Sequence, residues 1–214
     1  IFIPLIVGGG LRTIDDINKV LRAGADKVAL NTAAIRNPSF INEAAKRFGS
    51  STIVISIEAI KQADGKYYAF TDNGREPTGK EVIAWAKEAV THGAGEILLT
   101  SVDQEGTGFG YDIDLARHVS QEVSIPVIAC GGAGKPDDLK KVIEEGLADA
   151  VCLSSMLHYD YIQRHKVDGD FSSEGNIEFL KSREIFKKIR GENLPQIKLY
   201  LFQSGIQCRH EWGD

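Results

Sequence analysis

The chain contains two copies of one segment, and this internal repeat restricts the possible folds more than any other feature of the sequence. Residues 3–33 align with residues 125–156 when one residue is inserted near Leu147, and 14 of the 31 aligned positions are identical. An offset of 122 to 123 residues is far longer than the period of roughly 20–50 residues found in solenoid repeats. We therefore interpret the repeat as a duplicated half-domain. Each copy has the pattern of a strand, a glycine turn, an amphipathic helix, a second strand and a small polar turn.

The rest of the chain continues the same alternation of strands and helices. Apolar runs typical of strands occur at residues 2–7, 27–30, 52–57, 96–100, 126–129 and 150–153. Helical patterns occur at residues 13–23, 38–47, 80–91, 112–119 and 137–145, and residues 66–74 read as a small hairpin. Strands that are apolar throughout and separated by helices indicate a parallel sheet covered by those helices.

This pattern predicts an α/β fold, a TIM (β/α)8 barrel of the half-barrel-duplicated, phosphate-binding type. If the two halves are equal, the first two βα units of the barrel are lacking here, and residues 1–159 supply strands 3 to 8. We expect such a chain to be inactive as a cyclase and poorly soluble. The alternative is a six-stranded open sheet, which would leave two unpaired edges beside an apolar interior.

Composition excludes several classes of protein. The chain has 214 residues, of which 43% are hydrophobic, and a net charge of −5, which suits one soluble globular domain and argues against a nucleic-acid partner. No apolar run approaches the roughly 20 residues that a membrane-spanning helix needs. The three cysteines are odd in number and scattered, which predicts a reducing, cytoplasmic environment rather than a disulfide framework.

Small polar turns follow the strands of both repeats, at the end of a parallel barrel where active sites lie. Glycine turns begin at Gly8 and Gly131, and the next strand of each copy ends in Asn31-Thr32 or Ser154-Ser155. Glycine allows backbone N–H groups to approach an oxyanion closely, and a helix start adds further donors. Two matched turns would hold a substrate with a phosphate at each end. The alternative is that the glycines only permit tight turns.

Four stretches carry a specific resemblance: ADKVALNTAAIRNPSFI, FGSSTIVISIEA, THGAGEILLTSVDQEGTGFGYD and SIPVIACGGAGKPDDL. They resemble the cyclase subunits of imidazole glycerol phosphate synthase, in histidine biosynthesis. The resemblance covers residues 1–159 and resumes at residues 196–209 with the family's closing helix, so residues 195–214 belong to the barrel. It implies a heterodimer with a glutaminase subunit, which supplies ammonia at the barrel bottom. The substrate would be a bis-phosphorylated formimino aminoimidazole carboxamide ribonucleotide, converted to imidazole glycerol phosphate and AICAR without metal or cofactor.

The resemblance also implies roles for particular residues. One phosphate site would consist of Gly9, Gly10, Asn31 and Thr32, and the other of Gly131, Gly132, Ser154 and Ser155. Thr100 would face the site from the end of its strand. Lys27 and Glu96 match the charged gate for ammonia and Asp26 the glutaminase interface, although all three could instead form ion pairs at the barrel bottom.

Three departures from the family pattern matter. Of its two acid/base aspartates, one belongs to a strand that would precede residue 1, and the other is replaced by Glu58. A further acidic position in the following loop is Glu105 rather than aspartate. These changes leave open a paralogue that passes ammonia to another acceptor, such as a surface-polysaccharide sugar, or a non-catalytic scaffold for a glutaminase. Glu58 could also form only a structural ion pair.

Residues 160–194 read as an inserted loop and amphipathic helix, interpreted as a packed addition or a lid.

Overall fold

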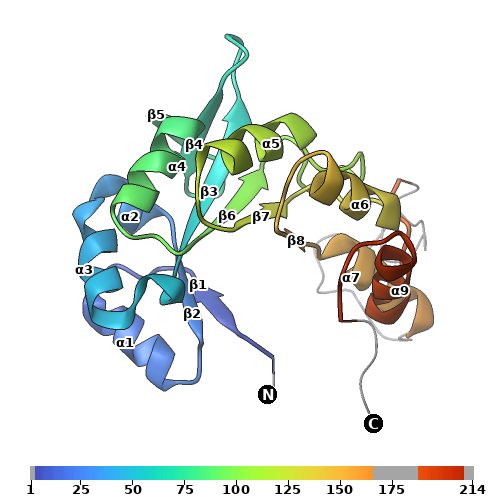
Figure 1. Ribbon diagram of the computed structural model, residues 1–214, viewed down its shortest axis with the longest axis horizontal. Coiled ribbons are helices and arrows are strands. Elements are labelled where there is room, and N and C mark those ends of the chain that lie inside the picture. The colour runs from blue at the N-terminus through green and yellow to red at the C-terminus, as the bar shows by residue number, and fades with distance from the viewer. Residues whose placement is uncertain (1–2, 166–187, 210–214) are drawn as a thin grey trace, which may run out of the picture.

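The computed structural model describes residues 3–165 and 188–209, and within them a curled parallel sheet forms the centre of the molecule. The parallel strands follow the order β1-β2-β3-β6-β7-β8, with helices on the outside of the curl (Figure 1). Their bounds are β1 Ile6–Gly8, β2 Lys27–Leu30, β3 Ile53–Lys61, β6 Glu96–Ser101, β7 Val127–Cys130 and β8 Ala150–Cys152. This arrangement is the wall of a TIM-type α/β barrel, as the sequence predicts. In the described part of the chain, β1 pairs only with β2 and β8 only with β7.

The helices are α1 Ile14–Arg22, α2 Thr32–Arg36, α3 Ser39–Phe48, α4 Val82–Thr91, α5 Ile113–Glu122, α6 Pro136–Glu144, α7 Ser155–Arg164 and α9 Leu194–Gln203, with a 3₁₀ turn at Ser50–Thr52. The sequence patterns locate α1, α3, α5 and α6 to within a few residues. They miss α2, because five residues are too few to show helical periodicity.

The end of β3 forms a projecting turn with the strand that follows it (Figure 1), and that strand then forms a hairpin with the next one. Its strands, β4 Tyr67–Thr71 and β5 Glu76–Glu81, are antiparallel, and β4 also pairs with the second half of β3. The sequence predicts a helix from residue 80, but β5 continues to Glu81 and α4 begins at Val82. Pro77 and Gly79 hide this strand from sequence patterns, because both residues are confined to edge strands or irregular places in sheets.

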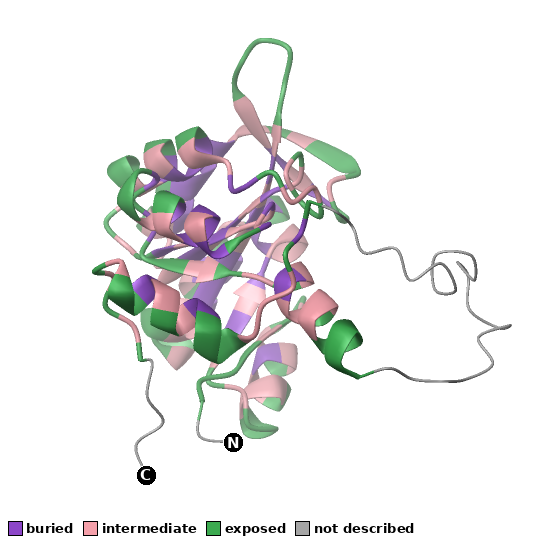
Figure 2. Cartoon of the chain, turned by 90° about the vertical axis from the view of Figure 1, so that its right-hand side faces the viewer, coloured by how far each residue is buried: buried purple, intermediate pink, exposed green. Residues whose placement is uncertain are grey.

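Alternation along the strands separates two faces of the sheet. Val28, Ile55 and Ile97 are fully buried and pack in the core beneath the helices, which Figure 2 shows as the buried interior. Their neighbours Lys27 and Glu96 are only partly buried and project to the opposite, concave face. The core stabilises the curl, and the concave face combines apolar residues such as Val54 and Leu98 in the middle of the strands with polar groups toward their ends.

The two repeats share hydrogen bonds as well as residues. The Asp16 carboxylate accepts from the backbone amides of Arg12 and Thr13, and Asp138 accepts equally from those of Gly134 and Lys135, at 2.9–3.0 Å. Each aspartate thereby fixes the turn that leads into its helix, α1 or α6.

The proposed insertion lies partly outside the described residues. The amphipathic helix predicted within residues 160–194 falls largely in residues 166–187, which are not described. The predicted boundary between residues 159 and 160 falls inside α7, which runs to Arg164. Beyond the gap, Ile189 is buried in the core around α6, α7 and α9, and the Arg190 amide donates to the Gly134 carbonyl at 2.7 Å. The end of the segment is therefore packed on the carboxyl-end loops.

Candidate functional site on the concave face

A row of polar side chains crosses the concave face near the carboxyl ends of four neighbouring strands. The sheet register pairs Glu58 with Thr100, Thr100 with Cys130, and Cys130 with Cys152. Each of the four residues alternates along its strand with the residues that face the core, so their side chains lie on the face opposite the helices. The structure thus brings Glu58 and Thr100, both predicted as catalytic, into direct register.

Glu58 is held by the hairpin beyond its strand. Its Oε2 accepts a hydrogen bond from the Gly74 amide at 2.8 Å, so the carboxylate is tied to the β4–β5 turn. Gly74 has a φ of +74°, and a Cβ there would lie 2.9 Å from a Val102 methyl group, which explains why the turn needs glycine. The hairpin tip therefore packs over the ends of β3 and β6. A carboxylate held this way can accept a proton at a fixed position.

Glu105 lies in the loop that follows β6. Its backbone amide donates to the Ser101 carbonyl at 3.1 Å, and a Cβ on Gly131 would lie 3.6 Å from the Glu105 Cα. Glu105 is therefore beside the second glycine turn, and its charge reaches the thiols of Cys130 and Cys152. The three predicted catalytic residues, Glu58, Thr100 and Glu105, share this end of the sheet.

The two glycine turns have the same backbone form but different surroundings. Gly9 and Gly131, equivalent in the repeats, have φ of +104° and +97°. No other atom would lie within 4 Å of a Cβ on Gly9, whereas a Cβ on Gly131 would lie 2.6 Å from the Ser101 carbonyl oxygen. Gly132 is packed in the same way against the Gly110 carbonyl. The second turn thus has a packing reason for glycine, while the first requires it for conformation alone.

The small polar pairs also match between the repeats. Asn31 precedes α2 and Ser154 precedes α7, and neither side chain bonds its own helix start. Their carbonyls accept from Ile35 and His158 at 3.0 and 2.9 Å, so the backbone turns are alike. The Asn31 amide group lies 3.4 Å from the Phe70 carbonyl oxygen, linking the first turn to the hairpin. Strands β2, β3 and β6 separate the two glycine turns in the sheet.

The opposite end of the strands carries the residues predicted for ammonia entry. Lys27 and Glu96 form an ion pair, and their side chains are 26% and 18% exposed. They stand at the first positions of β2 and β6, on either side of β3. Asp26 accepts a hydrogen bond from the Leu5 amide. This bond gives Asp26 a structural role in addition to its predicted place at the glutaminase interface.

The thiols of Cys130 and Cys152 contact each other, a feature that the scattered cysteine positions concealed. A hydrogen bond from the Cys130 thiol lowers the pKa of Cys152 to about 7. The same bond, together with burial and a smaller effect of Glu105, raises the pKa of Cys130. Thr100 also hydrogen-bonds to Cys130. Two neighbouring strands ending in cysteine are the only signal by which the sequence could have revealed this pair.

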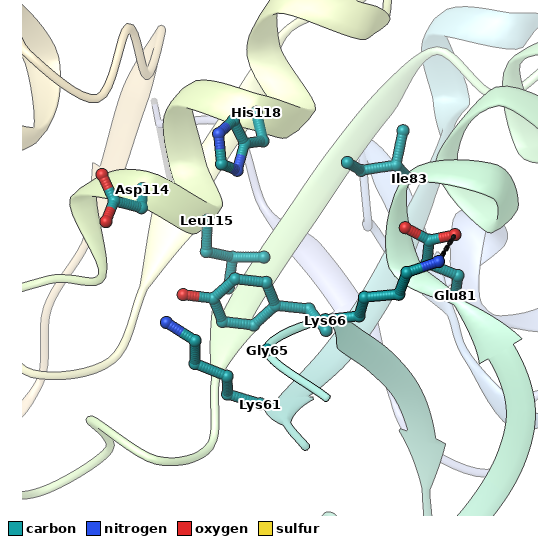
Figure 3. Close-up of a pocket in the computed structure, with 9 residues that line it drawn as sticks. Lys61, Gly65, Lys66, Glu81, Ile83, Asp114, Leu115 and His118 are labelled. Atoms are coloured by element: carbon teal, nitrogen blue, oxygen red, sulfur yellow. Dashed lines mark ion pairs between the residues drawn. The ribbon is translucent and has the colours of Figure 1, made fainter. Parts of the chain in front are cut away.

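The principal pockets of the described residues lie away from this row. One of about 240 Å³ lies between the hairpin and α5 (Figure 3), where His118 and Leu115 face Lys61 and Lys66. Another of about 540 Å³ lies between Arg12 and Arg47 on the outside of the barrel wall. Within residues 3–165 and 188–209, no group of three or more His, Cys, Asp or Glu residues is placed to bind a metal. The same part of the chain has no helix long and apolar enough to cross a membrane.

Comparison with known proteins agrees with this geometry. Residues 1–163 match the family described as histidine biosynthesis protein. The chain is 48% identical over 162 residues to the imidazole glycerol phosphate synthase subunit HisF of Alkaliphilus metalliredigens (strain QYMF). That alignment covers 76% of this chain and 64% of the relative, so the chain spans somewhat less than two thirds of the relative's length. The family match ends within α7, at residue 163, and so includes the first few residues of the segment interpreted as an insertion.

Proposed function

The chain belongs to the histidine biosynthesis protein family, and from this we propose that it acts as the cyclase subunit of imidazole glycerol phosphate synthase. The observation that carries the proposal is the pair of matched turns at the carboxyl ends of the strands, with carboxylates between them. Gly9 and Gly131 are equivalent residues of the two turns, and Glu58 projects from β3, which lies between β1 and β7 in the sheet. A ligand with a phosphate at each end fits this symmetry.

In the proposed reaction the two turns grip the ends of a bis-phosphorylated formimino aminoimidazole carboxamide ribonucleotide. Backbone N–H groups of Gly9, Gly10, Gly131 and Gly132 approach the phosphates, and Asn31, Thr32, Ser154 and Ser155 donate from the neighbouring turns. Anchoring both ends fixes the reacting centre over the middle strands, which lowers the entropic part of the barrier. No metal or cofactor takes part in this scheme.

The carboxylates near the middle of the face would perform the proton transfers. Glu58 accepts a proton on one carboxylate oxygen while the Gly74 amide holds the other, Oε2, in place. Glu105 lies at the second turn, where it can assist. Thr100 is in register with Glu58, and its hydroxyl forms a hydrogen bond with the reacting part of the substrate. The products would be imidazole glycerol phosphate and AICAR.

Ammonia would enter from the opposite end of the strands. The Lys27–Glu96 ion pair stands there, on either side of β3, and Asp26 lies beside it in sequence. We propose that a glutaminase subunit binds this end and that the ion pair controls passage of ammonia to the concave face. The support is the position of the pair together with the word "subunit" in the relative's name.

Genetic rescue tests the proposal. The complete gene encoding this chain is expressed in a histidine auxotroph that lacks its own cyclase, beside a Glu58→Gln variant as the matched control. We expect growth without histidine with the unaltered gene and a severe defect with the variant. If soluble protein accumulates and growth still requires histidine, the proposal is wrong.

A second function is favoured by one specific observation, the glutamates at positions 58 and 105. Glutamate extends the carboxylate by one methylene, roughly 1.5 Å, and Glu58 uses part of that reach to bind the Gly74 amide. A paralogue that delivers ammonia to another acceptor, such as a surface-polysaccharide sugar, would tolerate this change. A glutaminase stimulated by this protein without histidine rescue would indicate the paralogue or a non-catalytic scaffold.

A further inference from the structure

Cys130 and Cys152 are brought together by the fold although 21 residues separate them in the sequence. They are the last residues of the neighbouring parallel strands β7 and β8 and are direct partners in the sheet register. Ala129 faces the core and Val151 packs against it, so the adjacent cysteines both face the concave side. Both thiols are free, and that of Cys152 is on an exposed residue.

We propose that Cys130 and Cys152 form a reactive dithiol that exchanges with low-molecular-weight disulfides and closes reversibly to an internal disulfide. This site stands independently of the cyclase reaction, because it depends only on the two thiols and their surroundings. Cys152 is the attacking thiol and Cys130 the resolving thiol.

The assignment of Cys152 as the nucleophile follows from its exposure and its partner. The Cys130 thiol donates its hydrogen to the Cys152 sulfur, which stabilises the Cys152 thiolate and lowers its pKa to about 7. The thiolate is the reactive form, and exchange is fastest when the pKa of the attacking thiol is near the ambient pH. Burial of Cys152 and the negative charge of Glu105 both act in the opposite direction and raise this pKa, so the Cys130 thiol is the group that lowers it.

The exchange takes place in two balanced steps. The Cys152 thiolate attacks one sulfur of a small disulfide such as oxidised glutathione, forming a mixed disulfide and releasing one glutathione thiolate, which takes up a proton. Cys130 then loses its proton to solvent and attacks the Cys152 sulfur, which expels the second glutathione thiolate. Two protein thiols are oxidised to one disulfide, and one glutathione disulfide is reduced to two thiols.

The strand geometry permits closure but does not favour a relaxed bond. Neighbouring strands lie about 4.8 Å apart, within the range of about 4.4–6.8 Å between Cα atoms that disulfides span. Side chains that project in parallel at this spacing keep their Cβ atoms near the upper limit for a disulfide, so the closed form should be readily reduced. Either oxidised form would alter the face beside Gly131 and Ser154, where the second phosphate is proposed to bind.

The third cysteine provides an internal control. Cys208 lies in the segment after α9, and its thiol donates to the Lys198 carbonyl at 3.2 Å. A Cys208→Ser background removes its reactions from the measurement. Single Cys130→Ser and Cys152→Ser variants in that background then separate the attacking thiol from the resolving one.

The test is incubation of the folded protein with oxidised glutathione, followed by intact mass measurement and mapping of the modified cysteines. We expect an internal disulfide with loss of two hydrogens in the background protein, and a stable glutathione adduct on Cys152 in Cys130→Ser. Alkylation of Cys152 by iodoacetamide at pH 7 should slow about tenfold in Cys130→Ala, because alanine has no donor for the thiolate, whereas the Cys130→Ser hydroxyl can still donate.

Several outcomes would overturn the proposal. It is wrong if Cys130 and Cys152 stay reduced in the folded protein while both react in urea, or if the adduct forms on Cys130 alone. It is also wrong if the rate of Cys152 alkylation is unchanged in Cys130→Ala. Circular dichroism confirms that each variant is folded, and the mapping of the background protein does not depend on any of them. None of these readouts requires cyclase activity, so failure of the proposed function leaves the test intact.

Discussion

The carboxylate of Asp26 accepts a hydrogen bond from the backbone amide of Leu5 at 2.8 Å, and the second repeat contains the same bond. There Asp149 accepts from the Val127 amide, also at 2.8 Å, and the return bonds from the Asp26 and Asp149 amides to the Leu5 and Val127 carbonyls are 2.9 and 3.0 Å. Each aspartate therefore links the start of the first strand in its repeat to the start of the second. This shared bond explains why both repeats retain aspartate here.

Replacing either aspartate should destabilise the fold by a similar amount. We expect Asp26→Ala and Asp149→Ala each to lower the free energy of unfolding by about 1 kcal/mol, because a charge-assisted bond to a backbone amide is lost at a partly exposed site. Urea titration followed by circular dichroism measures the change. If Asp26 served only to bind a glutaminase, Asp149→Ala would be destabilising while Asp26→Ala would not.

The residue inserted in the second repeat, Leu147, is a point of backbone strain. It has a φ of +57°, whereas the corresponding turn of the first repeat contains Gly24, with a φ of +111°. Leu147 is 46% exposed, so its removal costs less packing than removal of a core leucine would. Leu147→Gly should therefore raise the free energy of unfolding by about 0.5–1 kcal/mol, since glycine adopts this conformation freely. Leu147→Ala is the matched control and should give no gain; equal stabilisation by both variants would contradict the explanation.

The Lys27–Glu96 ion pair should be more strongly coupled than an ordinary surface pair. Both side chains are less than one third exposed, whereas Lys19 and Asp15 on α1 are 71% and 67% exposed. A double-mutant cycle with Lys27→Met and Glu96→Gln should give a coupling energy of about 1 kcal/mol or more. The same cycle on Lys19 and Asp15 should give about 0.3 kcal/mol. Equal coupling energies in the two cycles would show that burial adds nothing at Lys27–Glu96.

Glu58 can be tested for its two possible roles with two substitutions. Glu58→Gln keeps an oxygen for the Gly74 amide but cannot take up a proton, so kcat should fall about 100-fold or more with KM little changed. Glu58→Asp retracts the carboxylate by one methylene, so the Gly74 amide should exchange its hydrogen faster with deuterium. If Glu58 only secures the hairpin, Glu58→Gln will keep full activity.

The repeat and the apolar runs predicted the barrel wall well because both are local or directly visible in the sequence. Strand β2 and helix α1 follow from apolar patterning and from the cap formed by Thr13 and Asp16. Strand β5 could not be predicted from such patterns, because its pairing with β4 is decided by the hairpin and not by the propensities of Pro77 and Gly79.

The glycine turns of the site were predicted from residue type, whereas its catalytic residues were predicted from the resemblance to the cyclase family. Glu58, Thr100 and Glu105 could be placed at strand ends from the sequence, and the structure gathers them at one end of the sheet. The bond from Gly74 to Glu58 depends on how the hairpin folds back, which no local pattern encodes. The contact between Cys130 and Cys152 depends on strand register, so it could not be inferred from their spacing alone.

The most direct test of the proposed function is turnover by the purified product of the complete gene. The protein is supplied with the bis-phosphorylated formimino substrate and ammonium at alkaline pH, which removes the need for a glutaminase, and both products are measured by chromatography. We expect imidazole glycerol phosphate and AICAR to form in equal amounts and only when ammonium is present. If the folded protein binds the substrate but forms neither product above the enzyme-free rate, the cyclase assignment is contradicted.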